Sequence, residues 1–387
     1  MTDHSKLIFI NCSGESFTPT TSGAISTWIW EVCQAAKRDG SFPAVFSRGG
    51  ASEPWPWNPL TVIPFPDIPW PWRFRGGGRA LGYWQRLLGW RRPMQAGYFS
   101  RLVGALKTAG HSKSTLFLQN DLEAAVVLRN AFPEAVIIHL AQNNDSCASR
   151  FRKRFPKSVN VALAVSNYCA DWNADYFGCP VKTLYSGVNT DVFSPSADPP
   201  SGAPVVNFHG RTSSVKGLDL LFQAGVALAG KGLKFSIQAI GSTHWGFNQT
   251  DGYQRRLTDQ ARELEGMGIA VRRPGHVDRF RLADELRKAQ IHCVPARWDE
   301  PFGLTTLEGM ACGLATVASR TGGTPEIVGD AGLLFERENV EQLAGHLERL
   351  ITDENLRAQY ALKARKRAEE FTWDRTWQKI KAMLPAQ

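Results

Sequence analysis

Short apolar runs alternate with longer stretches of helical periodicity along the chain of 387 residues. Such runs are typical of strands buried on both faces, whereas apolar positions three and four residues apart indicate amphipathic helices. In the first half we expect strands at residues 7–12, 42–46, 61–64, 115–118, 135–140, 162–165 and 181–184. In the second half we expect strands at residues 204–209, 234–239, 269–272, 291–294, 315–318 and 332–335. Helical patterns fill the gaps, for example at residues 23–37, 94–109, 121–131, 216–229, 279–289, 303–312, 338–351 and 355–370.

This alternation predicts an α/β fold in which parallel sheets carry helices on both faces. A chain of this length suits about two such domains. The stretch 188–204 interrupts the pattern with Ser, Asp, Gly and Pro, so we expect it to link a domain at 1–187 to a second at 205–370. Two doubly wound, Rossmann-like domains would place a ligand in the cleft between them, at the carboxyl ends of the strands.

The composition limits the class of protein. With 43% apolar and 21% charged residues the chain is ordinary for a soluble globular protein. No window of about 18 residues is apolar throughout, so we expect no membrane span. The amino-terminal run is short and carries an early acid, which is unlike a signal peptide. Seven cysteines lack the paired spacing of metal ligands, so we expect reduced, buried thiols in a cytoplasmic protein.

The most informative motif holds two glutamates in the run D299-E-P-F-G-L-T-T-L-E308. Pro301 disfavours helical backbone at Glu300, which we therefore expect on a loop. Apolar positions recur at helical spacing from about Gly303, so Glu308 should lie a turn or more inside a helix. Amides at this helix N-terminus would favour an anion. The amides in question belong to Phe302, Gly303, Leu304 and Thr305.

Together with the following G-M-A-C-G and G322-G-T-P-E-I-V runs, this motif resembles the E-x7-E segment of retaining glycosyltransferases with the GT-B fold, especially glycosyltransferase family 4. The resemblance implies that Glu300 contacts the donor sugar and that Glu308 holds the ribose hydroxyls of the nucleotide. It also implies that residues 371–387 form a final helix that crosses back onto the first domain. The alternative for the two glutamates is a charged helix start that binds no ligand.

A second motif, G210-R-T-S-S-V-K216-G, follows the first strand of the second half. Arg211 and Lys216 would lie at the carboxyl end of a strand near a helix that Lys216 opens, where a diphosphate gains two positive partners. The run is similar to the family's G-R-x4-K-G, whose cations hold the donor diphosphate. No D-x-D motif ends a predicted strand, so we expect no metal and no cofactor besides the nucleotide sugar. The alternative is two surface cations at a helix start.

Three further positions carry weaker signals. Gly23 opens a helix after the first strand, where the family has a Gly-Gly loop over the donor phosphates, but a serine-capped helix start is equally consistent. His139 ends a strand, as a histidine often does near the reacting sugar in this family, although structural hydrogen bonding is the alternative. The segment from Gly275 to Val277 resembles the loop whose backbone touches the nucleotide base.

A segment rich in Pro, Trp and Arg is the part least like the family. Tryptophan beside arginine suits a boundary with anionic lipid headgroups. The residues concerned are Trp70, Trp72, Arg73, Arg75, Trp84, Trp90, Arg91 and Arg92. A second basic run spans 150–157, and the net charge is +9. We expect peripheral contact with an anionic membrane, or else packing in an acceptor-side loop. No recognised motif supports nucleic-acid binding.

The reaction implied is that of a retaining hexosyltransferase, which moves a sugar from a nucleotide diphosphate sugar to an acceptor hydroxyl. The acceptor would be lipid-linked or part of a cell-envelope glycan, which would place the protein at the inner face of the cytoplasmic membrane. Three alternatives remain open on the same fold. They are a nucleotide-sugar epimerase, a glycan phosphorylase and a non-catalytic nucleotide-sugar-binding protein.

Overall fold

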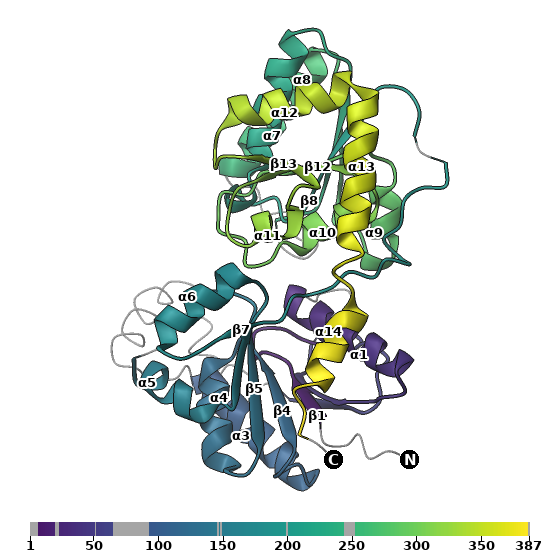
Figure 1. The fold of residues 1–387 in the computed structure, drawn as a ribbon. Coiled ribbons are helices and arrows are strands. Elements are labelled where there is room, and N and C mark those ends of the chain that lie inside the picture. Colours follow the sequence, from purple (N-terminus) through teal and green to yellow (C-terminus); the bar gives the residue numbers. More distant parts are fainter. Residues whose placement is uncertain are drawn as a thin grey trace. The chain divides into compact units, whose positions relative to one another are not determined.

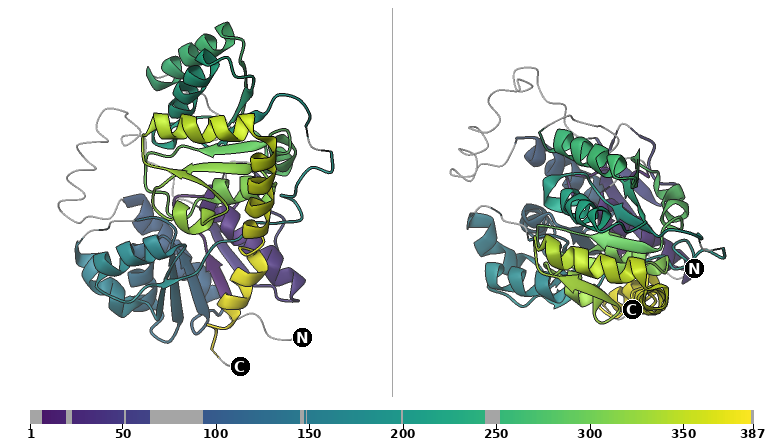
Figure 2. Two further views of the ribbon diagram at one scale, coloured as in Figure 1. Left: turned by 45° about the horizontal axis from the view of Figure 1, so that its top comes forward. Right: turned by 90° about the horizontal axis from the view of Figure 1, so that it is seen from above.

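The computed structural model describes residues 7–19, 23–50, 52–64, 93–144, 147, 149–198, 200–243 and 252–385. The chain forms two compact units, each with its own sheet and core (Figures 1 and 2). The first unit contains Met1–Tyr185 and Thr376–Gln387, and the second contains Ser186–Arg375. The division therefore falls just before the stretch that we expected to be a linker, and the last residues group with the first unit.

The first unit is built on a parallel sheet of seven strands in the order β3-β2-β1-β4-β5-β6-β7. Its strands are β1 (Leu7–Ile10), β2 (Ala44–Arg48), β3 (Leu60–Ile63), β4 (Thr115–Gln119), β5 (Val136–Ala141), β6 (Val161–Ala164) and β7 (Lys182–Thr183). Its helices are α1 (Ala24–Arg38), α3 (Pro93–Thr108), α4 (Leu122–Ala131), α5 (Ser149–Ser158) and α6 (Asn167–Phe177), with α14 (Trp373–Lys381) joining from the carboxyl end. The central strands are flanked by helices on both sides (Figure 1).

Alternate side chains of these strands pack on opposite faces of the sheet, as continuous apolar runs require. Ile8 and Ile10 join the core beneath α3 and α4. Phe9 points the other way, where its ring lies 6.0 Å from Trp28 of α1 and 5.3 Å from Phe117, centroid to centroid. On this second side α14 is fastened to the end of α1, because Trp377 Nε1 donates to Asp39 at 2.9 Å.

The second unit repeats the design with six parallel strands in the order β10-β9-β8-β11-β12-β13. This is a doubly wound order. From β8 the strands follow one another toward one edge of the sheet, and from β11 they follow one another toward the other edge. Its strands are β8 (Val205–His209), β9 (Ser236–Ile240), β10 (Ala270–Gly275), β11 (Ile291–Val294), β12 (Ala315–Ser319) and β13 (Gly332–Phe335). Its helices are α7 (Leu218–Gly230), α8 (Gly252–Gly266), α9 (Arg279–Leu286), α10 (Leu304–Ala311), α11 (Thr324–Val328), α12 (Val340–Thr352) and α13 (Glu354–Ala368).

All thirteen expected strands are confirmed, but one helix start is wrong. We expected Lys216 to open a helix, whereas residues Ser214–Lys216 form a short 3-10 turn and α7 begins at Leu218. The cause is Gly217, which has a φ of 72° and cannot continue a helix from the preceding turn. Lys216 is thereby set outside α7.

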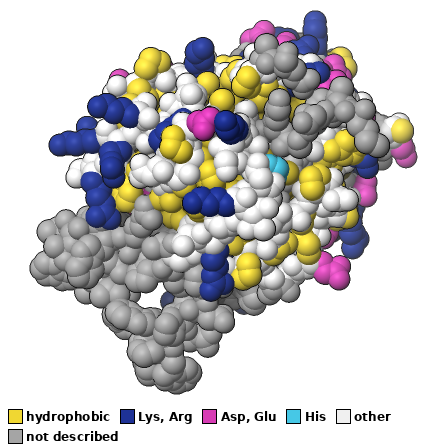
Figure 3. Space-filling view, turned by 90° about the horizontal axis from the view of Figure 1, so that it is seen from below, with side chains coloured by type: hydrophobic (Ala, Val, Ile, Leu, Met, Phe, Trp, Pro, Cys, Tyr) yellow, Lys and Arg dark blue, Asp and Glu magenta, His cyan; other side chains and the backbone are white. Residues whose placement is uncertain are grey.

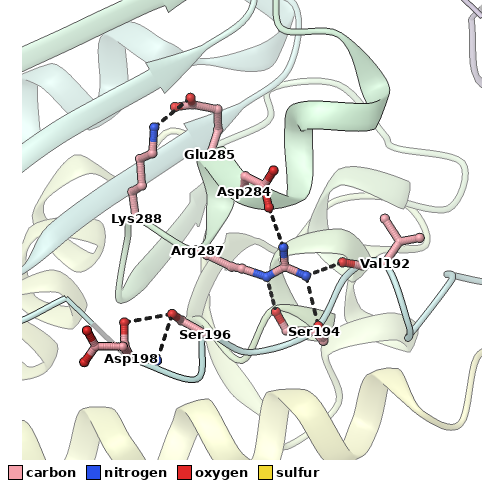
Figure 4. Close-up of polar contacts among 8 residues, drawn as sticks. All are labelled: Val192, Ser194, Ser196, Asp198, Asp284, Glu285, Arg287 and Lys288. Carbon is pink, nitrogen blue, oxygen red and sulfur yellow. Dashed lines mark hydrogen bonds and ion pairs between the residues drawn. The ribbon is translucent and has the colours of Figure 1, made fainter.

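Part of the expected linker is fastened to the second unit (Figure 4). The guanidinium of Arg287 donates to the Ser194 carbonyl at 2.9 Å and to the Val192 carbonyl at 2.5 Å, and it also pairs with Asp284 at 2.7 Å. These bonds hold residues 192–194 against the end of α9.

Of the two expectations about membranes, one can be compared with the structure and the other cannot. Among the described helices, none combines the length and the apolar character needed to cross a bilayer. The tryptophans and arginines expected at a lipid boundary, Trp70 to Arg92, lie outside the described residues.

All seven cysteines are free, and five of them are buried as expected.

Candidate functional site

The loops that follow the carboxyl ends of the parallel strands in the second unit lie along one edge of its sheet. Hydrogen bonds join neighbouring loops to one another. The amide of Thr212, after β8, donates to the Ser242 carbonyl after β9 at 3.0 Å. The amide of Gly323, after β12, donates to the Glu300 carbonyl after β11 at 2.7 Å. Residues from both glycosyltransferase-like motifs thus lie on these hydrogen-bonded loops, which we call the rim of the second unit.

Glu300 lies on a loop, as predicted, and it is buried. Its Oε1 pairs closely with Nζ of Lys216, 84 positions away in the sequence. The same oxygen accepts a hydrogen bond from Trp298 Nε1 at 2.7 Å. The Lys216 ammonium also lies 4.8 Å from the centroid of the Trp298 ring, within range of a cation–π interaction. The structure therefore brings together the cation of one motif and the first glutamate of the other.

The glycine pair of the G-G-T-P loop fixes the backbone of Glu300. Gly322 has a φ of 53°, and a Cβ at this position would lie 2.2 Å from the Glu300 carbonyl oxygen. Only glycine combines this left-handed conformation with so close an approach. The loop thus acts as a backbone clamp on Glu300.

The helix that carries the second glutamate starts as the motif predicted. Gly303, with a φ of 101°, caps α10, and the amides of Leu304 and Thr305 belong to the first turn. First-turn amides lack partners within the helix. Phe302 is buried before the helix, with its ring centroid 6.2 Å from that of Phe371. The predicted helix N-terminus is therefore present at the carboxyl edge of the sheet, and its binding of an anion stays a prediction.

Glu308 lies inside α10 and is buried. Its Oε1 accepts from the Arg279 guanidinium at 2.9 Å, and its Oε2 lies 3.6 Å from Nδ1 of His209. Burial raises the pKa of Glu308, and Arg279 opposes that shift. Burial, together with the charges of Arg279 and Lys216, lowers the pKa of His209 to about 3. His209 is therefore neutral at pH 7, and Arg279 supplies the charge that balances Glu308.

A third ion pair holds the turn that presents Lys216. Arg297 binds the buried Asp219 through both terminal nitrogens, at 2.6 and 2.7 Å. The same arginine donates to the Ser214 carbonyl at 2.9 Å, and its amide donates to the Val215 carbonyl at 2.8 Å. Backbone and side-chain bonds from one residue therefore fix the 3-10 turn that ends at Lys216.

The remaining predicted residues of this unit lie on the same rim. Arg211 follows Gly210 directly at the end of β8 and is exposed. Gly275 ends β10, and its carbonyl accepts from the amide of Gly241 at 2.8 Å. Val277 follows it on a half-exposed loop. No cluster of His, Cys, Asp and Glu suited to a metal ion occurs among the residues that the structure describes.

Two predicted residues belong to the first unit. Gly23 caps α1, and its amide and that of Ser26 both donate to Oε2 of Glu15 at 3.1 Å. The chain's own carboxylate thus occupies this helix N-terminus. His139 lies buried in β5, with its ring edge-on to Phe155 at 5.0 Å between centroids. Burial lowers the pKa of His139 to about 4, and within the described parts of the chain its Nε2 has no hydrogen-bond partner.

Four residues of the site were not found from the sequence. His209 and Trp298 stand beside recognised motifs, and that adjacency was the only available signal. Arg279 falls in the run 273–280 that resembles the base-contact loop, and Arg297 lies two residues before the glutamate motif, but their spacing to Glu308 and Asp219 carries no pattern. Their roles arise from the order of strands in the sheet.

The chain is similar in sequence to known glycosyltransferases. Residues 190–367 match the model described as Glycosyl transferases group 1. A D-inositol 3-phosphate glycosyltransferase from Nocardiopsis dassonvillei is 32% identical over 210 residues, which cover 51% of this chain and 48% of that protein. A phosphatidyl-myo-inositol mannosyltransferase from Mycolicibacterium smegmatis is 29% identical over 218 residues, covering 54% and 53%. The chain spans about half the length of the curated relatives it matches.

Solved structures share the fold over nearly the whole chain. Sucrose-phosphate synthase from Thermosynechococcus elongatus superposes with a TM-score of 0.75 at 20% identity and covers 98% of both chains. Anabaena HepE, solved in complex with UDP and glucose, has a TM-score of 0.70 at 18% identity and covers 99% of this chain and 100% of its own. At such low identity these likenesses establish the fold alone. The chain has the GT-B fold of two Rossmann-like units, and its second unit matches the family model of the group 1 glycosyltransferases.

Proposed function

We propose that the protein is a retaining glycosyltransferase that moves a hexose from a nucleotide diphosphate sugar to an acceptor hydroxyl. The observation that carries the proposal is the meeting of Lys216 with Glu300 beside the N-terminus of α10. One motif supplies a cation for a diphosphate, and the other supplies a carboxylate for sugar hydroxyls. A site that bound only a diphosphate, or only a sugar, would not need the cation and the carboxylate in contact.

In this proposal the second unit binds the donor. Arg211 and Lys216 hold the diphosphate, and the first-turn amides of α10 add hydrogen bonds and the helix dipole. Glu308 accepts hydrogen bonds from the ribose hydroxyls. The loop from Gly275 to Val277 contacts the base.

The chemical step depends on the leaving group. As the bond to the sugar breaks, negative charge grows on the diphosphate, where fixed cations and amides stabilise it. Two cations can do this without a metal ion, so we propose a metal-independent reaction. Glu300 orients the sugar, and the acceptor attacks on the face from which the diphosphate leaves. The anomeric configuration is therefore kept without an enzymic nucleophile.

The first unit supplies the acceptor side in this proposal, and His139 is its candidate contact to the reacting sugar. The unpartnered Nε2 of His139 supports this role, because a buried ring nitrogen costs free energy until a partner binds it. The amide of Gly23 already donates to Glu15, which counts against a phosphate contact. The alternative of a serine cap is not seen either, because Gly23 itself is the N-cap residue.

We further propose an acceptor that carries a polyol or lipid group. The relatives named above are a D-inositol 3-phosphate glycosyltransferase and a phosphatidyl-myo-inositol mannosyltransferase. A lipid-linked acceptor would bring the protein to the inner face of the cytoplasmic membrane.

Helix α5 supports a peripheral contact of this kind. It buries Phe151 and Phe155 and exposes five cations with no acid between them. The five cations are Arg150, Arg152, Lys153, Arg154 and Lys157. Lys and Arg side chains gather along one edge of the face in Figure 3, on the side where α5 lies in Figure 1. Such a helix attracts anionic headgroups.

The proposal is tested by incubating the protein with a panel of nucleotide sugars, first chosen by thermal shift, with and without polyol acceptors. We expect release of a nucleoside diphosphate that accelerates with the correct acceptor. An isomerised donor sugar would indicate an epimerase, release of a sugar phosphate from a glycan with inorganic phosphate would indicate a phosphorylase, and binding without turnover would indicate a sensor. Each of these three results would contradict the proposal.

A further inference from the structure

A row of polar side chains crosses the buried sheet of the second unit. Arg272, Gln238, Asn207 and His292 are aligned neighbours on four adjacent strands, β10, β9, β8 and β11. The last three are buried, and the strands around them are apolar. Polar groups inside a sheet are costly unless every one of them is hydrogen-bonded.

The bonds in this row run in one direction. Arg272 Nη1 donates to Gln238 Oε1 at 2.6 Å, and Gln238 Nε2 donates to Asn207 Oδ1 at 3.0 Å. Asn207 Nδ2 then faces Nδ1 of His292 at 3.1 Å. Nε2 of His292 lies 3.0 Å from the carbonyl oxygen of Thr305. Since a carbonyl can only accept, Nε2 carries the proton and Nδ1 accepts from Asn207.

The row ends on the helix that carries the nucleotide-binding groups. Thr305 is in the first turn of α10, and Glu308 follows on the same helix. The imidazole of His292 fits against Gly309, where a Cβ would lie 2.2 Å from His292 Cδ2. A glycine inside a helix costs about 1 kcal/mol relative to alanine. Here the glycine makes room for the ring that bonds the first turn.

The ring is also held uncharged. His292 is fully buried, and burial lowers its pKa to about 3. A neutral imidazole with one donor and one acceptor matches the two partners that it has. The contact with Thr305 is therefore a fixed hydrogen bond across the working pH range.

We propose that His292 and Gly309 form a positioning pair that sets the first turn of α10 for the donor's nucleoside diphosphate. The inference rests on the proposed function, because it assigns the ligand of α10 from that proposal. His292 touches neither the sugar nor the phosphates in this assignment. It acts through the Thr305 carbonyl, and Gly309 permits the contact.

The test uses the close fit between the two residues. Gly309→Ala alone places a methyl group against the ring, and His292→Ala alone leaves a cavity. The double variant His292→Ala with Gly309→Ala relieves the clash and fills part of the cavity, so we expect its Tm to exceed that of Gly309→Ala. It still lacks the bond to Thr305. His292→Gln keeps a donor for Thr305 and an acceptor for Asn207, so it serves as the conservative rescue.

Two measurements are made on wild type, the double variant and His292→Gln. Titration calorimetry with UDP and with GDP measures affinity, and hydrogen exchange measures protection of the peptide that covers residues 304–311. We expect the double variant to bind whichever of UDP and GDP wild type prefers about tenfold more weakly. A change of this size corresponds to the net free energy of one hydrogen bond. Its α10 amides should exchange faster, and His292→Gln should remain within about threefold of wild type.

The outcomes separate the inference from the proposed function. If wild type binds neither UDP nor GDP, the proposed function fails, and the assignment of a ligand to α10 fails with it. If wild type binds and the double variant binds equally well with unchanged exchange, only the positioning pair is overturned. A His292→Gln variant as weak as the double variant would also overturn it, because the hydrogen bonds would then not be the cause.

Discussion

At the scale of single residues, the site depends on buried charges that balance one another. Lys216 pairs with Glu300 beside the Trp298 ring, and Arg279 pairs with Glu308. Removing one partner of a buried pair leaves the other uncompensated, which costs far more than the pair itself contributes. In the proposed function, a donor would meet Lys216 already fixed by its pair with Glu300, so this group would need little reorganisation during the reaction.

The buried histidines predict how stability depends on pH. The pKa of His292 is lowered to about 3 in the folded protein, against an ordinary value of 6.5. As pH falls below 6.5, the unfolded chain takes up a proton that the folded protein does not, so stability falls. The loss is about 1.4 kcal/mol per pH unit for each such histidine.

We therefore expect the free energy of unfolding in urea to fall more steeply for wild type than for His292→Gln as the pH is lowered from 7.5 to 5. The comparison isolates one histidine, because His209 and Glu308 remain in both proteins. Parallel pH profiles for the two proteins would show that the ring takes up its proton as readily in the folded protein as in the unfolded chain, contrary to this account.

At the scale of elements, the parallel strands bring the motifs together and glycines allow their loops to touch. Apolar runs predicted the strands because both faces of each sheet are buried, and those predictions are confirmed. The start of α7 was wrong because Gly217 takes a left-handed conformation that periodicity does not register. The contact of Lys216 with Glu300 could be inferred only from the family motifs. The pairing of Arg279 with Glu308 needed the structure, since it depends on which strands are neighbours.

Gly322→Ala tests the clamp on Glu300. The new Cβ would lie 2.2 Å from the Glu300 carbonyl oxygen, so that loop must move. We expect the catalytic efficiency to fall by at least about tenfold, because misplacement of a positioning group by about 1 Å is enough for such losses. The measurement is kcat/KM for donor and acceptor.

Gly232→Ala is the matched control for that variant. Gly232 also has a left-handed conformation, with a φ of 76°, but its Cβ would meet nothing within 4 Å. We expect it to lower Tm through backbone strain of about 1 kcal/mol while leaving kcat/KM unchanged. Equal kinetic effects in both variants would mean that strain, and not the contact with Glu300, causes the loss.

At the scale of the whole molecule, the chain combines a GT-B fold with a charge of +9. Five of the exposed basic residues that contribute to this charge lie on α5. Each cation near an anionic bilayer contributes about 1 kcal/mol, and salt screens the attraction. We expect flotation with vesicles that contain phosphatidylglycerol at low salt, and release at high salt.

Replacing the five α5 cations with glutamine should weaken that flotation, whereas replacing the exposed Lys363 and Lys366 of α13 should have little effect. Phe151 and Phe155 stay in place, so the helix keeps its buried face. If wild type does not float with anionic vesicles at low salt, the membrane contact is wrong. If the α5 variant floats as wild type does, α5 is not the contact.

The central claim is that cations of the second unit receive the departing diphosphate. The most direct measurement is the initial rate of nucleoside diphosphate release from the preferred nucleotide sugar by wild type, Lys216→Ala and Arg211→Ala, with Tm confirming that each protein is folded. We predict that both variants lose at least about a hundredfold in kcat, as removal of a group that stabilises the transition state does. Folded variants that release the diphosphate at close to the wild-type rate would contradict the account.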